Sequence, residues 1–442
     1  MRIYAEMNKL AIIGAGVTGL SAAYHLEQQG FSNYQIFEKD SAVGGLCKSF
    51  LIDGFTFDYA SHILYTEDGY AEELIKKTLL KDKFNSQLRK AFVYYRNVYT
   101  KFPFQGHLYG QDPDIVKECL LGLVKARYEG VQNPTNFEDW INSTFGSGIA
   151  KHFMLPYNRK LWAINLKKMS YDWISERVPI PEVEETLEGA LKPPQRNYGP
   201  NAHFWYPLKS GIGALVNGFL PSVRNINLNS EVSKISLATR EVEVNGNRTG
   251  YDKLISTMPL PKIISLISDD IPFQVKQAAG SLKYNIVYVV SLAVNRANIS
   301  GYHWIYFPEK KYIFHRVSFP MNLSAAMAPE GKSSISAELS VSMQNPFKMS
   351  HGEIIEAVVD GLQKAGILNK SDSILLRDIK CLDPAYVIYT HDRERNIELI
   401  HQFLNDKEIY PCGRFGSWAY LNTDRAILSG RKIADELLND LI

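Results

Sequence analysis

Leu10-Ala-Ile-Ile-Gly14-Ala-Gly16-Val-Thr-Gly19-Leu-Ser-Ala-Ala is the stretch that decides the fold of this 442-residue chain. An apolar run precedes a glycine-rich turn, and a stretch suited to a helix follows it to about Gln29. In such a strand–turn–helix unit, Gly14 permits the tight turn, Gly16 lets the backbone approach a pyrophosphate, and Gly19 lets the helix pack against the strand. The helix N-terminus then faces the phosphates with its partial positive charge. The stretch therefore predicts a dinucleotide-binding site.

The residues that follow indicate which dinucleotide is bound. A second strand is predicted at Tyr34–Phe37, and Glu38 closes it where an acceptor for a ribose hydroxyl belongs. Gly44 and Gly45 come shortly after this acid. The glycine pair resembles the extended fingerprint of the glutathione-reductase-type FAD proteins, in which these glycines pass close to the cofactor. The resemblance implies FAD rather than NAD.

The composition excludes several classes of function. Lys+Arg 49 against Asp+Glu 47 leaves a net charge of +2, which is too balanced for a nucleic-acid binder. The longest apolar segment, 10–26, is interrupted by glycines and polar residues, so we predict no membrane span. The first residues lack the zones of a secretory signal. Four scattered cysteines without a CxxC pair predict buried free thiols, no metal site and a cytoplasmic protein.

Aromatic residues are unusually frequent, at 12% of the chain with 25 tyrosines. A core does not need so many hydroxylated rings, so we expect part of them at a binding site.

The order of predicted elements indicates an α/β protein. Residues 75–190 are predicted to be mostly helical, with one helix starting at Pro113 behind an Asp112 cap. Strand-like runs occur between 280 and 345, and a last helix is predicted from about Asp424 to Leu441. We predict a Rossmann-like FAD-binding domain assembled from discontinuous segments, with a helical insert and an antiparallel β-sheet insert. The boundaries are 1–75, 205–265 and 380–442 for the FAD-binding domain, 76–204 for the mainly helical substrate domain, and 266–379 for the antiparallel β-sheet substrate domain.

A series of short motifs is spread over nearly the whole chain. They are Phe102-Pro-Phe104-Gln105, His152-Phe-Met-Leu-Pro-Tyr157-Asn158-Arg-Lys-Leu-Trp162, Met169-Ser-Tyr-Asp-Trp173-Ile-Ser-Glu-Arg177, Gly199-Pro-Asn201, Trp304-Ile-Tyr306, Phe314-His-Arg316 and Gly413-Arg414-Phe-Gly-Ser-Trp-Ala-Tyr420-Leu-Asn-Thr-Asp424. In this order they resemble UDP-galactopyranose mutase, especially the longer eukaryotic-type enzymes. That family lies within the glutathione-reductase-like and amine-oxidase-like FAD superfamily.

The resemblance implies roles for individual side chains. Arg177 and Arg316 would clamp a diphosphate from two sides as catalytic residues, because a guanidinium donates two parallel hydrogen bonds while it stays charged. His62 would line the galactose and flavin side. The implied substrate-binding residues are Phe102, Phe104, Gln105, Asn158, Trp162, Asn201, Trp304, Tyr306, Tyr386 and Tyr420. The implied cofactor-binding residues are Gly14, Gly16, Gly19, Glu38, Gly44, Gly45, Arg414 and Asp424.

The activity that the resemblance implies is the interconversion of UDP-galactopyranose and UDP-galactofuranose without net redox change. N5 of reduced FAD would attack the anomeric carbon and displace UDP. NADPH or NADH would reduce the flavin transiently. The family's role points to cell-surface glycan biosynthesis, and the partner would be the UDP-sugar, with a homo-oligomer left open.

Two positions depart from the family pattern. Phe102 stands where the family has a tyrosine, and in an ungapped comparison Leu323 stands where another tyrosine binds the diphosphate. These departures leave the exact nucleotide sugar open, including a related pyranose.

Two other classes of function also stay open. An FAD oxidase or desaturase of the amine-oxidase and protoporphyrinogen-oxidase type shares the N-terminal fingerprint and the split architecture. It predicts an apolar or amine-selective cleft and steady oxygen consumption. A non-catalytic flavoprotein that acts as a scaffold or redox sensor predicts that Arg177→Ala and Arg316→Ala leave ligand binding unchanged.

Overall fold

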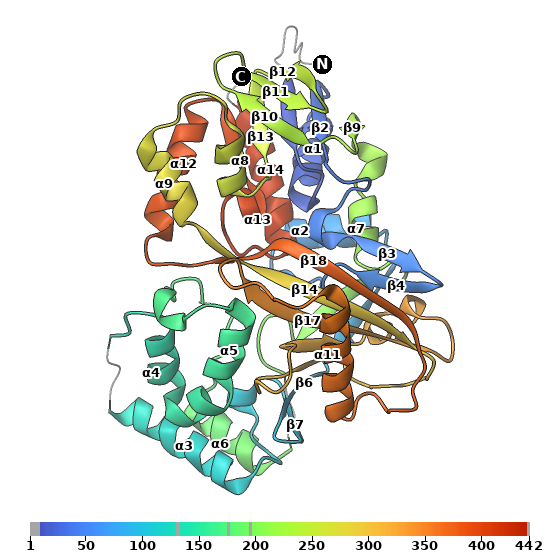
Figure 1. Cartoon of the computed structure of the whole chain (residues 1–442), viewed down its shortest axis with the longest axis vertical. Helices are drawn as coiled ribbons and strands as arrows, with labels where there is room; N and C mark the ends of the chain where they lie inside the picture. The colour runs from blue at the N-terminus through green and yellow to red at the C-terminus, as the bar shows by residue number, and fades with distance from the viewer. Residues whose placement is uncertain (1–8, 130–132, 175–176, 194–196, 440–442) are drawn as a thin grey trace.

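The computed structural model describes residues 9–129, 133–174, 177–193 and 197–439 (Figure 1). The first eight residues, used above to predict that no secretory signal is present, lie outside these ranges. The last two residues of the helix predicted to reach Leu441 also lie outside them.

A five-stranded parallel sheet forms the upper part of the molecule in Figure 1, with strand order β19-β13-β1-β2-β9. The central strand β1 is buried over all four residues, as expected for its Leu-Ala-Ile-Ile sequence in a sheet covered on both faces. All three segments predicted for the FAD-binding domain contribute strands to this sheet. The bounds are β1 (Leu10–Ile13), β2 (Tyr34–Phe37), β9 (Ile226–Asn227), β13 (Lys253–Ser256) and β19 (Ile409–Pro411).

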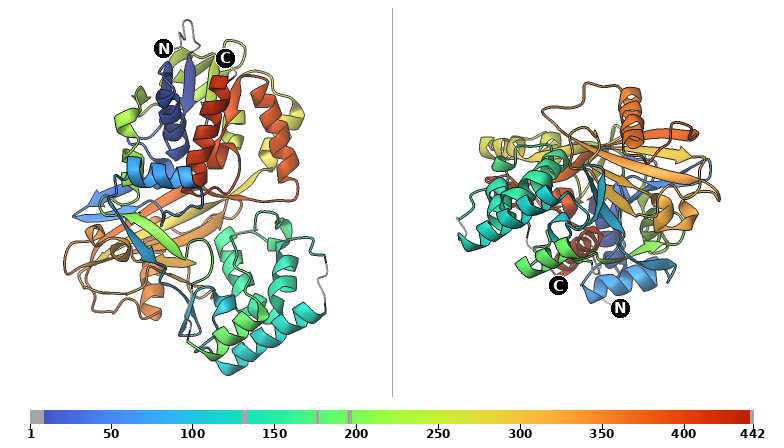
Figure 2. Two further views of the ribbon diagram at one scale, coloured as in Figure 1. Left: turned by 180° about the vertical axis from the view of Figure 1, so that it is seen from behind. Right: turned by 90° about the horizontal axis from the view of Figure 1, so that it is seen from below.

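Helices cover both faces of the parallel sheet. Because side chains alternate along a strand, Leu10 and Ile12 join one core and Ala11 and Ile13 join the other. On the first face α1 and α14 lie side by side, which Figure 2 shows from behind. The elements of the first face are α1 (Val17–Gln28), α7 (Gly213–Asn217) and α14 (Thr423–Asn439). Those of the second are α8 (Leu260–Leu266), α9 (Phe273–Ser281), α12 (Arg393–Asn405) and the small sheet of β10 (Val232–Ser236), β11 (Glu241–Val244) and β12 (Asn247–Gly250).

A seven-stranded sheet crosses the middle of the molecule, with order β18-β14-β17-β16-β15-β6-β7. Neighbouring strands are antiparallel except β15 and β6, which are parallel. Helix α11 (His351–Lys364) packs on one face through Ile354, Val358 and Leu362. The strands are β6 (Ala91–Tyr95), β7 (Val98–Lys101), β14 (Lys283–Val294), β15 (Trp304–Tyr306), β16 (Arg316–Ser318), β17 (Ser333–Ser342) and β18 (Ile374–Ile388).

The prediction that residues 75–190 are mostly helical is wrong for 84–101, where β5 (Phe84–Leu88), β6 and β7 form. The β6–β7 hairpin turns at Arg96 and Asn97, whose φ values of 49° and 64° match a two-residue hairpin turn. The dense aromatic and β-branched residues of this stretch favour strands over helices. Strand β5 pairs with β8 (His203–Pro207), outside the seven-stranded sheet.

The helical insert lies at the lower left of Figure 1. Its first helix confirms the predicted start, because Pro113 is the first helical residue and the Asp112 carboxylate accepts the Asp114 N–H at 2.9 Å. The insert contains α3 (Pro113–Tyr128), α4 (Phe137–Ile149), a π-helical turn at Ala150–Met154, α5 (Leu155–Trp162) and α6 (Val183–Leu191). Shorter elements elsewhere are α2 (Gly69–Glu73), α10 (Pro320–Leu323), α13 (Gly413–Gly416), β3 (Ser49–Ile52) and β4 (Phe55–Asp58).

Two sequence expectations concern the whole chain. Within the described residues, every helix is too short or too polar to cross a bilayer. The four cysteines all lie in the described part and are free thiols. Cys47, Cys119 and Cys412 are buried as predicted, but Cys381 is exposed, because it lies on β18 at the edge of the seven-stranded sheet.

Candidate active site

A cavity of about 740 Å³, here called the cofactor cavity, opens where the strands of the parallel sheet end. Ile13 ends β1, Glu38 follows β2, Thr257 follows β13 and Gly413 follows β19, and all four line it. Open parallel sheets bind their ligands in this crevice, beyond the carboxyl ends of the strands.

Two glycines of the first turn are required by its geometry. Gly14 has φ +98°, and a Cβ atom there would overlap the side chain of Thr257. A Cβ atom on Gly19 would overlap the carbonyl oxygen of Gly14. Gly19, predicted as a cofactor contact, is not among the residues that line the cavity; it lets α1 start close against the turn. Gly44 donates its N–H to the carbonyl oxygen of Ala15 at 2.8 Å, which brings the second glycine pair against the first.

Glu38 closes the far wall of the cofactor cavity. It is buried, and its carboxylate accepts the N–H groups of Ala15 at 2.8 Å and Asp40 at 3.0 Å. These bonds hold the carboxylate in place and leave acceptor capacity for ribose hydroxyls. Lys48, which forms an ion pair with Asp40, lies on the same wall. The glycine cradle, the helix start and the fixed carboxylate fit the adenosine diphosphate part of FAD.

Two further cavities lead away from the cofactor cavity. The outer cavity, of about 450 Å³, lies between the helical insert and the seven-stranded sheet. The inner cavity, of about 150 Å³, shares Tyr306, Arg316 and Tyr420 with the outer cavity, and His62 and Arg414 with the cofactor cavity. The three cavities therefore adjoin one another in the order cofactor, inner, outer.

Arg316 begins β16 and faces both the inner and the outer cavity. Its Nη2 donates to both carboxylate oxygens of Glu338 at 2.6 Å. Burial lowers the pKa of Arg316, but the Glu338 carboxylate and neighbouring tyrosines outweigh it and raise this pKa well above its usual value. The guanidinium therefore stays charged. Its buried Nε has no hydrogen-bond partner among the described residues, which leaves a donor for an anion.

Arg177 reaches the outer cavity from the opposite side. Its guanidinium donates to the carbonyl oxygens of Trp173 and Tyr420 and lies 4.8 Å from the centre of the Tyr420 ring. The side chain is exposed and forms no ion pair with a carboxylate in the described ranges. Arg177 can therefore bring its positive charge to a ligand in this cavity, whose lining also includes the carboxylates of Glu67 and Asp424.

Tyrosines separate the two arginines. Tyr386 and Tyr420 make an edge contact with ring centres 5.5 Å apart, and Trp162 packs on both of them. Tyr306 is the last residue of β15, and burial raises the pKa values of Tyr306 and Tyr386. Their hydroxyls therefore stay protonated and can donate to phosphate oxygens.

Helix α5 and the Phe102–Gln105 turn form the far end of the outer cavity. Trp162 donates its indole N–H to the Asn158 side-chain oxygen at 3.2 Å, and Asn158 donates to the Met154 carbonyl at 2.7 Å. Gln105 donates to the Pro179 carbonyl at 2.9 Å, and its buried side-chain oxygen has no partner among the described residues. Phe102 lies beside these groups. Flat rings and amide groups of this kind suit a nucleobase.

Phe104 does not line the cavity. It is fully buried and stacks on Phe153 with ring centres 5.3 Å apart, so it supports the turn from behind.

His62 lies where the inner and cofactor cavities meet. Its Nδ1 donates to the Ala60 carbonyl at 3.0 Å. Burial, with the nearby Arg414 and Arg316 charges, lowers the pKa of His62 to about 4, so the ring is neutral at pH 7. The predicted Trp304 and Asn201 also line the inner cavity, as does Leu323.

Of the two cofactor contacts predicted near the start of α14, Arg414 lines the cofactor cavity and Asp424 does not. Thr423, the first residue of α14, lines the cofactor cavity, so the positive end of the helix dipole is directed there. The Asp424 carboxylate instead lines the outer cavity and accepts the Thr66 hydroxyl at 2.8 Å. Arg414 lines the cofactor and inner cavities and donates to the Leu421 carbonyl.

The sequence analysis did not single out several lining residues, among them Tyr65, Tyr157 and Glu338. Tyr65 accepts the Asn422 side-chain N–H at 2.8 Å, and Tyr157 makes an edge contact with Tyr306. The sequence does carry a signal for Glu338, since it is the only charge in the strand Ser-Ile-Ser-Ala-Glu-Leu-Ser-Val-Ser, where serines otherwise alternate with apolar residues. A charge buried in a strand is rare unless it is paired.

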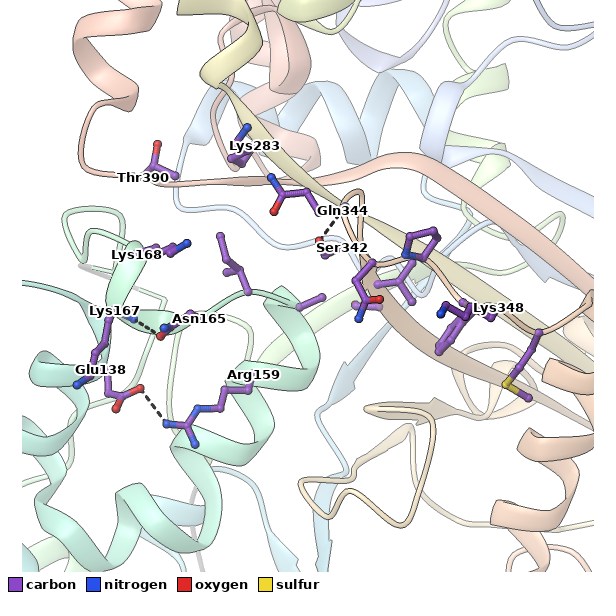
Figure 3. A pocket seen from close by; sticks show the side chains of 18 residues that line it. Glu138, Arg159, Asn165, Lys167, Lys168, Lys283, Ser342, Gln344, Lys348 and Thr390 are labelled. Carbon is purple, nitrogen blue, oxygen red and sulfur yellow. Dashed lines mark hydrogen bonds and ion pairs between the residues drawn. The ribbon is translucent and has the colours of Figure 1, made fainter.

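A separate hollow of about 1100 Å³ lies between the end of α5 and β17 (Figure 3). Lys167, Lys168, Lys283 and Lys348 line it, and Arg159 there is paired with Glu138 at 2.9 Å. None of the predicted site residues lines this hollow.

The sequence profile of the flavin containing amine oxidoreductases matches residues 17–438. The chain belongs to this family. As a member, it is a flavin-dependent enzyme of the amine-oxidase superfamily, and the family agrees with the predicted FAD cofactor.

Solved structures with different names share the fold of this chain. The chain is similar to reduced UDP-galactopyranose mutase, with a TM-score of 0.93 and 28% identity over 98% of this chain and 94% of that one. It shares its fold with a protein described as a protoporphyrinogen oxidase from Exiguobacterium sp., with a TM-score of 0.76 and 15% identity over 98% of this chain and 99% of that one.

Similar curated sequences are oxidases and desaturases. Coproporphyrinogen III oxidase of Staphylococcus aureus is 23% identical over 66% of this chain and 69% of its own length. A 4,4'-diapophytoene desaturase of the same organism is 47% identical over 64 residues, which are 14% of this chain and 12% of the desaturase.

Proposed function

We propose that this family member is a flavin-dependent mutase that interconverts UDP-galactopyranose and UDP-galactofuranose. The observation that carries the proposal is the outer cavity, where two guanidinium groups from different inserts face a row of tyrosines. An oxidase with an apolar substrate gains nothing from such charges, because each costs free energy to desolvate. A diphosphate would engage both. The similarity to a solved UDP-galactopyranose mutase along 98% of the chain also supports the proposal.

Each part of a UDP-sugar would contact a different group of the residues that line the cavities. Phe102, Gln105, Asn158 and Trp162 would hold the uracil end by ring contacts and amide hydrogen bonds. The diphosphate would lie on Arg177 and Arg316, with the hydroxyls of Tyr306, Tyr386 and Tyr420. The sugar would then reach the inner cavity beside His62, Asn201 and Trp304, next to the cofactor.

The cofactor cavity would hold FAD through the two glycine pairs, Glu38, Arg414 and the start of α14. Bound there and reduced by NADPH or NADH, FAD would supply the nucleophilic nitrogen that the reaction at the anomeric carbon needs. The chain supplies the rest. Arg316 and Arg177 stabilise the charge of the departing diphosphate and keep it within reach for its return. The positive end of α14 favours an electron-rich cofactor beside it.

The runner-up is an FAD oxidase, favoured by the similarity to coproporphyrinogen III oxidase along 66% of the chain. This enzyme would consume oxygen with an amine or porphyrinogen substrate and would have no need of UDP.

Equilibrium titration of the holoprotein with UDP separates the two. We expect UDP to bind, and Arg177→Ala to weaken binding by about 10- to 100-fold, the loss of a hydrogen-bonded charge. Absence of UDP binding, together with oxygen uptake on coproporphyrinogen, would exclude the mutase.

A further inference from the structure

We propose that Lys160 is a positioning residue that locks the two walls of the outer cavity together, so that the groups for the base and for the diphosphate face one ligand. The inference rests on the proposed function, because the ligand that reports it is UDP. One wall is α5, which carries Asn158 and Trp162. The other is the hairpin of β15 and β16, which carries Tyr306 and Arg316.

Lys160 makes the direct polar connection between these walls. Its Nζ donates to the carbonyl oxygens of Phe307 at 2.7 Å, Glu309 at 3.1 Å and Phe314 at 2.5 Å. An ammonium group has three N–H donors, so one lysine uses its full capacity on one loop. The loop begins directly after Tyr306 and ends two residues before Arg316. The ammonium therefore fixes the loop that joins the two diphosphate contacts.

Lys160 itself is not a contact of the ligand. It is absent from the lining of the outer and inner cavities, whereas its helix neighbours Tyr157, Asn158 and Leu161 line the outer one. Tyr157 packs edge-on against Tyr306 at 5.3 Å between ring centres, so the two walls also touch through rings. The sheet holds the hairpin through β17 and β6, so the ammonium acts on the position of the 307–314 loop and of α5 relative to each other. Without it, that position would depend on ring contacts, which resist sliding less than three directed hydrogen bonds.

The charges around Lys160 make this connection sensitive to pH. Burial lowers the pKa of Lys160 to about 7, and the Glu309 carboxylate only partly offsets this. Arg316 lies on the same hairpin, and burial with the Arg316 and Lys160 charges lowers the pKa of His315 well below its usual value, so His315 is neutral. Above pH 7 the neutral amine has two N–H donors for three carbonyls. The hydrogen bonds between Lys160 and the 307–314 loop therefore weaken as pH rises.

The test compares UDP affinity of the FAD-bound wild type, Lys160→Met and the control Lys167→Met by calorimetry. Lys167 lies seven residues away and lines the separate basic hollow. We expect Lys160→Met to raise the dissociation constant of UDP by about 10- to 100-fold, the scale of one hydrogen bond lost between a charged group and the ligand. FAD content and the control should stay at wild-type values. Equal UDP affinity in Lys160→Met and wild type would overturn the inference.

Lys160→Arg covers the case in which the methionine variant does not fold. Arginine stays charged at all these pH values, so its UDP affinity should be flat between pH 6.5 and 8.5, whereas that of the wild type should fall. Identical pH profiles in both proteins would overturn the inference. A wild type that binds no UDP at all would instead overturn the proposed function, which distinguishes the two failures.

Discussion

The cofactor cavity and the outer cavity are built in different ways. The cofactor cavity depends on backbone shape: a glycine at φ +98°, a second glycine pair against it and one fixed carboxylate, all within the first 45 residues. The outer cavity depends on side chains from separate segments, with Arg177, Arg316 and Tyr420 supplied by three parts of the chain. We therefore expect FAD binding in the cofactor cavity to tolerate side-chain changes around it. Ligand binding in the outer cavity should be weakened when any one of its side chains moves.

Among substitutions that test this difference between the two cavities, we expect the largest effect on stability and UDP binding at Arg316. Arg316→Ala would leave Glu338 buried without its partner, which costs about 3–5 kcal/mol of unfolding free energy. Replacing the pair by Arg316→Met and Glu338→Leu should restore most of that stability but not UDP binding. Urea unfolding and UDP calorimetry measure the two separately. Retained UDP binding in the double variant would show that Arg316 is only a structural residue.

A substitution at Gly14 tests FAD binding in the cofactor cavity without changing the outer cavity. Gly14→Ala forces a Cβ atom against Thr257 at a positive φ, a strain of about 1–3 kcal/mol, which should weaken FAD binding by about 10- to 100-fold. The control is Gly280→Ala, since a Cβ atom at Gly280 meets nothing within 4 Å. The ratio of flavin to protein absorbance after dialysis reports the loss. Full flavin content in Gly14→Ala would contradict the role of the turn.

Acid should destabilise the folded protein through His303, which directly precedes the inner-cavity residue Trp304. Its Nδ1 accepts the Lys90 N–H at 3.1 Å and its Nε2 bonds to the Gln87 side-chain oxygen at 2.9 Å, so the neutral ring is satisfied. Burial, with the Lys90 charge, lowers its pKa to about 4. As pH falls from 6.5 to 4, the unfolded chain gains this proton while the folded chain does not. The folded state then loses up to about 1.4 kcal/mol per pH unit.

Denaturant unfolding between pH 7 and 5 measures this effect. His303→Gln should lose less stability than the wild type over that interval. An equal loss in both proteins would mean that other groups carry the acid sensitivity.

The smallest expected effect comes from the turn at Phe102. Phe102→Tyr adds a hydroxyl at the cavity wall and should tighten UDP binding by no more than about 1 kcal/mol. Phe104→Tyr is the matched control, because it buries the same hydroxyl in the core and should cost about 1–3 kcal/mol of stability without any gain in affinity. Tighter binding in Phe104→Tyr would place that side chain at the ligand.

The same contrast explains what the sequence could predict. Strand β1, the Gly14 turn and Glu38 form one contiguous stretch whose conformation follows from its own residue types. The capped start of α3 was predictable for the same reason. The convergence of Arg177, Arg316 and the tyrosines came from the resemblance to a family, because spacing along the chain does not encode it.

The missed features depend on partners far away in the chain. Lys160 meets carbonyl groups about 150 residues further on, and Phe104 is removed from the cavity wall by packing on Phe153. Strands β6 and β7 are a different case, because their aromatic and β-branched residues already favour strands locally, and the pairing of β6 with β15 more than 200 residues later only extends their sheet.

Direct conversion is the most decisive measurement. Dithionite-reduced holoprotein is incubated with UDP-galactofuranose, and chromatography quantifies UDP-galactopyranose. We predict conversion by the reduced protein, none by the oxidised protein and none by the Arg316→Met, Glu338→Leu variant. Reduced protein that leaves UDP-galactofuranose unchanged, while the oxidised protein consumes oxygen with a porphyrinogen substrate, would contradict the assignment of a nucleotide-sugar mutase.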